Sequence, residues 1–512
     1  MSVRTELRSP ALLWAVALGV LANALVRVPG RPGLNAALWA LSGVVVIVVL
    51  LRRRAEPASR ETRWLVGGAL GFAGALMLRD AEALAVFSLV SAVLLLGLAA
   101  GRAASAWAAR ATVSDGMVAA VRLAVLCATG PVGWGRGAPN PAEGAARWTR
   151  QARTVAWGTV MALPALLVLT TLLMSADPVF ARIVHDLGLI DIEPLMEDLI
   201  FTAVIAWLTA GYLRAFLVHD DKVTDRLRVP QSAFAAAEVS VALWFLNLLF
   251  VAFMAVQLRY LFGGADLVEV TAGLSYAEYA RRGFFELVAT AALVVPILLL
   301  ADWAASSDTP RARVILRGTM LVLVVLLVGV IASAAYRMQL YQNAYGLTEL
   351  RLYVSVFIVW LTAVLGWLVL TVLRGRRDRF VFGSIVAGVV CIAALHGLNP
   401  HAVIVRVNIA RAAAGAEYDG RYLRTLSADA VPTLVARLDH LPKAERCHVA
   451  HMLEERWQGD RRGGWRTWNL SDWRARRLVR TEDAAHRRYL ARCPEAEQPD
   501  SLRSVPSPAS GD

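Results

Sequence analysis

Lysine is nearly absent from this chain of 512 residues, because Lys222 and Lys443 are the only two. Charged residues make up 18% of the sequence, below the roughly 25% that is usual for soluble domains. No glycine-rich phosphate-binding loop is present, and Gly263–Gly264 reads as a simple turn. These absences exclude the common nucleotide-binding loops, and no cofactor is expected.

A recognisable metal site is also missing. His448 and His451 are three positions apart on one predicted helix, whereas the zinc-protease helix spaces its histidines by four. His440, Glu454 and Glu455 lie nearby, but solvated surface side chains explain them more simply than a zinc site. We therefore expect no metal.

Cysteine is scarce, with four in the whole chain. Cys127 and Cys391 lie in apolar stretches, where inert thiols are expected. Cys447 and Cys493 are the only two in the polar C-terminal region. They are either two unrelated thiols or a disulfide, which would require that region to lie outside the cytoplasm.

Long apolar runs are what the sequence has in abundance: 57% of the residues are hydrophobic and the mean hydropathy is +0.52. Each run approaches the ~20 residues that a helix needs to cross a ~30 Å hydrocarbon core. They predict an all-α, polytopic bundle of about 11 transmembrane helices, at 11–28, 34–51, 64–79, 82–100, 154–174, 199–217, 238–258, 284–303, 314–334, 352–373 and 381–398. The first run is expected to be retained rather than cleaved as a signal peptide, because a second follows at once.

Arginine is concentrated in the loops after the even-numbered runs, whereas the loops after the odd-numbered runs are short or acidic. Because loops rich in lysine and arginine stay in the cytoplasm, this pattern places the N-terminus inside and, after eleven spans, the C-terminus outside. The net charge of +13 then reflects membrane topology, and the bilayer rather than a nucleic acid is the expected partner.

The sequence divides into five expected regions. These are N-terminal transmembrane helices at 1–110, a cytoplasmic or interfacial linker at 111–153, a core transmembrane bundle at 154–398, a small helical C-terminal domain outside the membrane at 399–495, and a disordered tail at 496–512.

The C-terminal domain shows helical spacing of its apolar residues near 430–438. That helix begins either after a cap at Ser427 or with Pro432 as its first residue. Further helices are expected from Lys443 to Trp457 and from Ser471 to Leu490, the last capped by Ser471 or Asp472. The domain is basic, which suits contact with anionic lipid headgroups.

Three polar stretches, expected on the outer side, concentrate the residues that could form a binding site: 273–287, 336–353 and 399–429. Glu286 lies inside an apolar run, and arginine pairs such as Arg337 and Arg351 suit a phosphate or carboxylate. An aromatic belt, helix caps or a salt-bridge network would explain the same residues about as well. The candidate residues are Tyr276, Glu278, Tyr279, Arg282, Glu286, Arg337, Tyr341, Tyr345, Glu349, Arg351, Asn408, Arg411 and Asp419.

The motifs GLSYAEYARRGFFEL, YRMQLYQNAYGLTELRLYV, NPHAVIVRVNIARAAAGAEYDGRYLRTLSADAVPTL and SADPVF resemble a bacterial family known as domain of unknown function 4173, of which 4153 is a close sibling. The resemblance covers roughly residues 150–440. It implies a multi-pass protein of the bacterial cytoplasmic membrane without an established activity or catalytic residues. The family pattern has an acidic residue where His401 and Ala402 stand here, which weakens a role for that position.

Three functions remain open from the sequence. The first is a non-enzymatic membrane protein that senses or scaffolds envelope components through an outward-facing polar cavity, with an unidentified envelope or membrane protein as a partner. The second is a transporter or flippase for an anionic or lipid-linked solute, although most runs lack the deep polar residues that a carrier needs. The third is a membrane enzyme that acts on a lipid-linked substrate.

Overall fold

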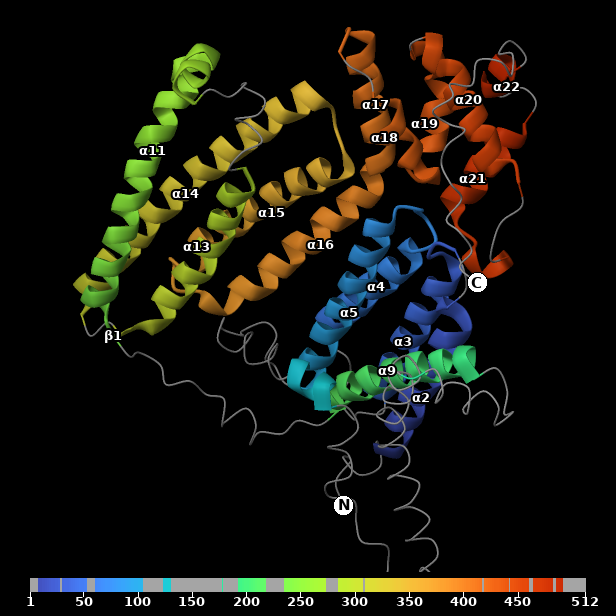
Figure 1. Cartoon of the computed structure of the whole chain (residues 1–512). Helices are drawn as coiled ribbons and strands as arrows, with labels where there is room; N and C mark the ends of the chain where they lie inside the picture. Colours follow the sequence, from blue (N-terminus) through green and yellow to red (C-terminus); the bar gives the residue numbers. More distant parts are fainter. Residues whose placement is uncertain are drawn as a thin grey trace, which may run out of the picture. The chain divides into compact units, whose positions relative to one another are not determined.

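The computed structural model is helical along the predicted apolar runs that it describes (Figure 1). The residues that it describes are 8–27, 30–52, 60–104, 123–129, 177, 192–217, 234–272, 284–306, 309–416, 419–441, 443–459, 464–481 and 485–490. They fall into two compact units, one formed by 1–74 with 88–229 and the other by 75–87 with 230–512.

Ten of the eleven predicted apolar runs lie on described helices. The run at 154–174 falls outside the described residues. The helices are α2 (Arg8–Val26), α3 (Leu34–Arg52), α4 (Arg60–Ala75), α5 (Glu82–Ala104), α9 (Ile192–Leu217), α11 (Ala236–Ala272), α13 (Phe284–Ala304), α14 (Pro310–Tyr345), α15 (Glu349–Thr371) and α16 (Phe380–Leu398). The two-residue strands β1 (Phe234–Ala235) and β2 (Ala305–Ser306) pair in parallel, and the 3₁₀ helix η3 (Arg377–Arg379) precedes α16.

The expected count of about eleven spans is not confirmed. Within the described part of the chain, six helices are long and apolar enough to cross a membrane: Glu82–Ala99, Ala236–Gln257, Phe284–Ala304, Pro310–Tyr345, Glu349–Thr371 and Arg377–Leu398. Ala11–Val26 and Leu34–Leu50 are apolar but shorter. α4 has only 16 residues, three of which are charged: Arg60, Glu61 and Arg63. The chain is therefore a helical membrane protein, and the part of it that the structure describes contains six helices of sufficient length and hydropathy to cross the bilayer.

The first unit is held together by close packing between α2 and α9. A Cβ atom on Gly19 would lie only 2.7 Å from the carbonyl oxygen of Thr202 and 2.9 Å from the Cβ of Ala206. Small residues at such a contact let two helix backbones approach closely. At the end of α2, Arg27 pairs with Glu197 at 2.5 Å and with Asp198 at 2.6 Å.

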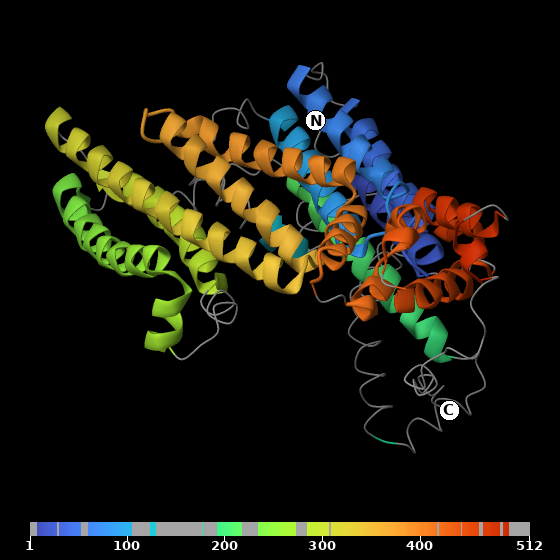
Figure 2. The same ribbon diagram turned by 90° about the horizontal axis from the view of Figure 1, so that it is seen from above.

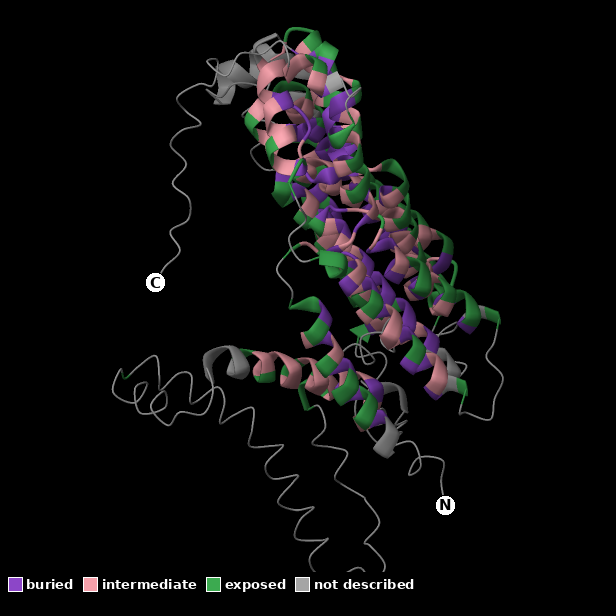
Figure 3. Cartoon of the chain, turned by 90° about the vertical axis from the view of Figure 1, so that its right-hand side faces the viewer, coloured by how far each residue is buried: buried purple, intermediate pink, exposed green. Residues whose placement is uncertain are grey.

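The second unit contains the long helices α11 and α13 to α16, which Figures 1 and 2 show running along one another. The indole nitrogen of Trp360 donates to the carbonyl of Ser384, and that of Trp367 to the carbonyl of Arg379, each at 3.1 Å, which ties α15 to α16. Exposed residues cover the outer faces of these helices (Figure 3), and large apolar side chains such as Phe245 and Val325 are among them. Such faces suit contact with lipid.

The C-terminal region is helical and belongs to the second unit, so its separation as a domain of its own stays a prediction. Its elements are α17 (Pro400–Ala413), α18 (Gly420–Thr425), η4 (Ala428–Ala430), α19 (Val431–Ala436), η5 (Leu438–His440), α20 (Lys443–Trp457), η6 (Gly464–Thr467), α21 (Leu470–Arg480) and α22 (Ala485–Leu490). Their core is apolar and includes Ile404, Leu434, Leu453 and Val479. The tail at 496–512 lies outside the described residues.

Some of the predicted helix limits in the C-terminal region agree with the structure and others do not. α20 has the predicted limits, and Ser427 caps the 3₁₀ turn η4 while Pro432 lies in the first turn of α19. The single helix expected from Ser471 to Leu490 is wrong. α21 ends at Arg480, where Thr481 is extended, and α22 begins at Ala485. Its cap is Asn469 instead of Ser471 or Asp472, because the Asn469 Oδ1 accepts from both of their backbone N–H groups.

Cys447 is disulfide-bonded, and Cys127 and Cys391 are free. Cys493 lies outside the described residues, so its pairing with Cys447 stays a prediction.

Candidate functional site

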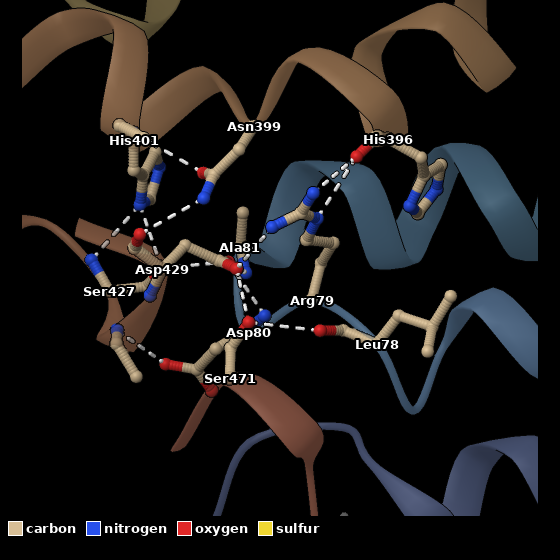
Figure 4. Close-up of polar contacts among 12 residues, drawn as sticks. Leu78, Arg79, Asp80, Ala81, His396, Asn399, His401, Ser427, Asp429 and Ser471 are labelled. Carbon is tan, nitrogen blue, oxygen red and sulfur yellow. Dashed lines mark hydrogen bonds and ion pairs between the residues drawn. The ribbon is translucent and has the colours of Figure 1, made fainter. Parts of the chain in front are cut away.

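A cluster of buried polar side chains lies where the second unit's helices end and the C-terminal domain begins (Figure 4). We call it the polar junction and define it as Arg79, Asp80, Asn399, His401, Ser427, Asp429, Asn469 and Ser471. These residues come from the turn between α4 and α5, the break between α16 and α17, the turn at η4 and the start of α21. At each of these places the backbone leaves its helix, so N–H and C=O groups need side-chain partners.

Asp429 lies at the centre of the polar junction and is only 3% exposed. Its Oδ2 accepts from the backbone N–H of Asp80 at 2.7 Å and of Ala81 at 3.0 Å, just before α5 begins. Its Oδ1 accepts from the hydroxyl of Ser471 at 2.5 Å. A carboxylate is favoured at a helix start, where unpaired N–H groups carry partial positive charge.

Asp80 makes the reciprocal contact, because its Oδ2 accepts from the backbone N–H of Ala428 at 3.0 Å. Beside it, the Arg79 guanidinium donates to the carbonyl of His396 at 2.6 and 3.0 Å and lies 3.6 Å from Asp429. An arginine suits the carbonyls in the last turn of a helix such as α16. The two aspartates thus cap each other's segments, and Arg79 supplies the balancing charge.

His401 and Ser427 form the next part of the polar junction. The Nδ1 of His401 accepts from the backbone N–H of Ser427 at 3.0 Å and lies 2.7 Å from the Ser427 hydroxyl. Since Nδ1 is an acceptor, the ring proton of neutral His401 is assigned to Nε2. That atom lies 3.3 Å from Glu349 Oε1, within ion-pair distance but without hydrogen-bond geometry.

Asn399 turns the chain from α16 into α17. Its φ of 53° is in the left-handed region, which asparagine tolerates better than most residues with a side chain. Its side-chain oxygen accepts from the backbone N–H of Ala402 at 3.2 Å, and its amide donates to the carbonyl of Asp429 at 3.1 Å. The Asn-Pro pair of the third polar stretch is therefore a capped bend that joins the last long helix to the polar junction.

A second set of contacts holds the corner between α14 and α15, which we define as Tyr345 to Glu349. The amide of Asn408 bonds both backbone groups of Leu347, accepting at 2.7 Å and donating at 2.8 Å. Gly346 has a φ of 78°, and a Cβ there would lie 2.6 Å from the Arg411 guanidinium. The positive φ of Gly346 and the closeness of the Arg411 side chain both favour a residue without a Cβ at this position.

Two arginines and two phenols complete the corner. Arg411 donates to the carbonyls of Asn343 and Ala344 at 2.7 to 3.2 Å, and Arg351 donates to those of Tyr345 and Gly346 at 3.1 and 2.5 Å. The Arg351 guanidinium also lies 4.0 Å from the centre of the Tyr341 ring, a cation–π contact. These groups satisfy the carbonyls that α14 leaves open at its end.

Glu349 connects the corner to the polar junction. It accepts from the Tyr353 hydroxyl at 2.9 Å, and its backbone N–H donates to the Tyr422 hydroxyl at 2.6 Å. Burial raises the pKa of the Tyr422 phenol, so this hydroxyl stays protonated at neutral pH. Together with the Glu349–His401 contact, these bonds form one polar network from the α4–α5 turn to the α14–α15 corner.

The structure brings together seven of the thirteen candidate residues, all in or beside the corner: Tyr341, Tyr345, Glu349, Arg351, Asn408, Arg411 and Asp419. Asp419 caps α18 by accepting from the Tyr422 backbone N–H at 3.0 Å. Arg337 is buried further along α14 and donates to the Gln257 side chain at 2.7 Å, and Glu286 is exposed in the first turn of α13. Tyr276, Glu278, Tyr279 and Arg282 lie outside the described residues.

Sequence reasoning missed several members of the polar junction. Arg79 and Asp80 form a charged pair in a short turn between two apolar runs, which was a usable signal. His401 was discounted because it departs from the family pattern, yet it contacts both Ser427 and Glu349. Ser471 was read only as a helix cap, whereas its hydroxyl donates to Asp429 and to the carbonyl of Leu78.

The chemistry of the polar junction is that of a structural joint. Ser427, His401 and Asp429 are between 2% and 4% exposed, and their polar atoms bond to backbone groups of the chain and to one another. Among the described residues, no group of three or more histidine, cysteine or acidic side chains is arranged to hold a metal ion.

Residues 66–436 match the model of a domain of unknown function, DUF4153. The chain belongs to this family. The match corrects the resemblance drawn from the sequence, which named the sibling family 4173, and it extends further toward the N-terminus than residue 150. It includes every member of the polar junction except Asn469 and Ser471. No curated protein and no solved structure matches the chain.

Proposed function

We propose that this DUF4153 protein is a non-enzymatic protein of the bacterial cell envelope that holds its C-terminal domain rigidly at the outer membrane–water boundary. There the domain senses or scaffolds envelope components. The observation that carries this proposal is the polar network, in which Asp429 and Asp80 join the turn before α5 to the domain. Because the candidate polar groups bond within the chain, we place the contact with partners on the surface of the domain instead of in a polar cavity.

A membrane enzyme is the second candidate, and one contact favours it. The hydroxyl of Ser427 lies 2.7 Å from His401 Nδ1, as a serine nucleophile lies beside its base. However, Ser427 is only 2% exposed, and Nδ1 already accepts the backbone N–H of Ser427. A substrate would have to displace these contacts to reach the hydroxyl, so the joint explains the geometry better.

The outward placement is tested by cysteine labelling in intact cells. Cys127 and Cys391 would be changed to serine, and a membrane-impermeant maleimide would be applied with and without prior reduction. Labelling of Cys447 only after reduction is expected, since this thiol is disulfide-bonded in the structure. Labelling that requires permeabilised cells would place the domain in the cytoplasm and overturn the outward placement.

Scaffold and enzyme are separated by complementation of a deletion strain under envelope stress. Ser427→Ala removes the hydroxyl, and Asn408→Ala serves as the matched variant because it loosens the corner without touching that hydroxyl. A scaffold loses function in proportion to the loss of domain docking, measured by protease resistance of 399–490 in both variants. If Ser427→Ala alone fails to complement the deletion, while its expression and domain docking are normal, the protein is an enzyme and the scaffold proposal is wrong.

A further inference from the structure

Two consecutive elements of the C-terminal region, η6 and α21, each expose a tryptophan next to an arginine. Trp465 in η6 is 61% exposed and Trp473 in α21 is 43% exposed. The Arg466 guanidinium lies 5.9 Å from the centre of the Trp465 ring, and the Arg477 guanidinium lies 5.4 Å from that of Trp473. Large aromatic rings at this exposure are unusual on a surface that meets only water.

α21 has two distinct faces. Ser471, Ala475 and Val479 recur every four residues and are buried, so this face packs into the domain. Trp473, Arg474 and Arg477 are exposed on the other face. Among the described residues, no carboxylate pairs with Arg474 or Arg477, whereas the neighbouring Arg476 bonds Asp472 at 3.0 Å. The exposed face therefore presents cationic groups and an indole ring for an external partner. We call it, with Trp465 and Arg466, the Trp-Arg face.

The start of α21 is bonded to the turn before α5. The backbone N–H of Leu470 donates to the carbonyl of Met77 at 2.8 Å, and the Ser471 hydroxyl donates to that of Leu78 at 2.9 Å. α5 then begins at Glu82 with a segment apolar and long enough to cross a membrane. The start of α21 thus lies at the end of a membrane-crossing helix.

This position puts the Trp-Arg face at the depth of lipid headgroups. With a rise of about 1.5 Å per residue, Trp473 and Arg477 lie within about 10 Å of Ser471 along the helix. The headgroup regions add several ångströms on each side of a core about 30 Å thick. Tryptophan is enriched in this layer, and each basic residue near an anionic membrane surface contributes about 1 kcal/mol of attraction.

We propose that the Trp-Arg face, formed by Trp465, Arg466, Trp473, Arg474 and Arg477, binds the phosphate groups of anionic phospholipids at the bilayer surface. The arginines contact the headgroup phosphates and the indole rings enter the boundary layer. The domain is then fixed from two directions, by the polar junction to the helix ends and by this face to the lipid.

Hydrogen exchange of the full chain in nanodiscs tests the proposal. Discs of phosphatidylcholine alone would be compared with discs that also contain phosphatidylglycerol, and exchange would be followed in peptides covering 464–480. We expect exchange there to slow several-fold in the anionic discs, and this protection to weaken as salt is added. Equal exchange in both discs would overturn the proposal.

The variant Arg474→Gln/Arg477→Gln should remove the difference between the two discs. Arg421→Gln/Arg488→Gln is the matched control, because it removes the same charge from exposed arginines on α18 and α22 and should keep the difference. Both pairs are exposed, so folding should be preserved. Lipid-dependent protection that survives in Arg474→Gln/Arg477→Gln would overturn the assignment of lipid binding to the Trp-Arg face. Protection that appears in native membranes but in neither disc would overturn lipid binding and indicate a protein partner.

Discussion

The long helices and the polar junction use opposite means to hold parts of the same unit together. Where α11 packs on α14, the buried side chains are mainly apolar, such as Leu243, Leu323 and Leu327. Polar bonds also cross between these two helices: the Asn247 amide donates to the carbonyl of Thr319 at 3.1 Å, and the Gln257 side chain accepts from Arg337 at 2.7 Å and from Ser333 at 3.3 Å. In the polar junction, Asp429 alone accepts from two backbone N–H groups and two hydroxyls.

The difference follows from the state of the backbone. A continuous helix satisfies its own N–H and C=O groups, so two helices can meet through apolar side chains alone. The chain at the α4–α5 turn, the α16–α17 bend and η4 has no such internal partners. Side-chain carboxylates, hydroxyls and amides take their place, and removing one of them leaves buried groups unpaired.

The largest effect is expected from Asp429→Ala. This change leaves the N–H groups of Asp80 and Ala81 without their acceptor, removes one of the two acceptors near the Ser471 hydroxyl, and removes the carboxylate that lies beside Arg79. Breaking a buried, hydrogen-bonded charged group costs about 3–5 kcal/mol. The measurement is thermal unfolding of the full chain in nanodiscs, together with protease resistance of residues 399–490.

Asp378→Asn is the control for that experiment, because Asp378 lies in the short 3₁₀ helix η3 and is not buried. Its melting temperature should match that of the parent protein. A melting temperature of Asp429→Ala within a degree or so of the control would show that the polar junction does not hold the domain.

A smaller loss is expected from Asn408→Ala at the corner. Two hydrogen bonds to Leu347 disappear, and the backbone groups of a residue that is 5% exposed lose their partners. The cost should be about 1–3 kcal/mol, read from thermal unfolding. Asn343→Ala is matched to it, since that side chain is exposed on the same corner. An equal loss in both variants would mean that the Asn408 amide has no special role.

The sequence predicts the long helices better than it predicts the contacts of the polar junction. Apolar runs predict the long helices, because burial in lipid selects for them along a continuous stretch. Asn408, Arg411 and Asp419 were selected from one polar stretch and do meet the corner. Asp80 and Asp429 are joined across a sequence separation of 348 or 349 residues, and no periodicity within either segment signals a reciprocal cap.

For the membrane spans, the sequence predicts more than the described structure contains. Hydropathy alone treats 64–79 as a span, whereas α4 starts at Arg60 and stops at Ala75, short of the length of a typical crossing. The bend at Asn399 depends on a left-handed residue with an amide that caps the next helix. Asn-Pro in the sequence indicates a break, but its partner Asp429 emerges only from the three-dimensional structure.

Asn247→Leu should change stability by less than about 1 kcal/mol, because polar contacts between helices in a membrane contribute little on average. The amide is 1% exposed, and its Oδ1 has no hydrogen-bond partner within the described part of the chain. Leucine has a similar size and removes that unsatisfied atom. The melting temperatures of Asn247→Leu and Asn408→Leu would be measured side by side. An equal loss of stability in the two variants would contradict the distinction between the two regions.

The smallest expected effect is a loss of stability at low pH, and it concerns His486. This residue is fully buried in α22 but lacks the partners that His401 has. Neither ring nitrogen makes a hydrogen bond among the described residues. Burial, and then the charge of Arg487, lower the pKa of His486, while the Val479 backbone and Glu454 offset this only in part. The unfolded chain therefore binds the proton more readily than the folded domain, and stability falls as the pH drops through about 6.5.

Exchange in peptides covering 443–457 and 485–490 should therefore speed up between about pH 7.5 and about pH 5.5, after correction for the intrinsic pH dependence of exchange. His486→Leu should remove this acceleration, whereas changing the exposed His440 to leucine should keep it. An acceleration that persists in His486→Leu would assign the acid sensitivity to another group. If no acceleration is seen even in the parent protein, the unpartnered His486 does not make the domain sensitive to acid.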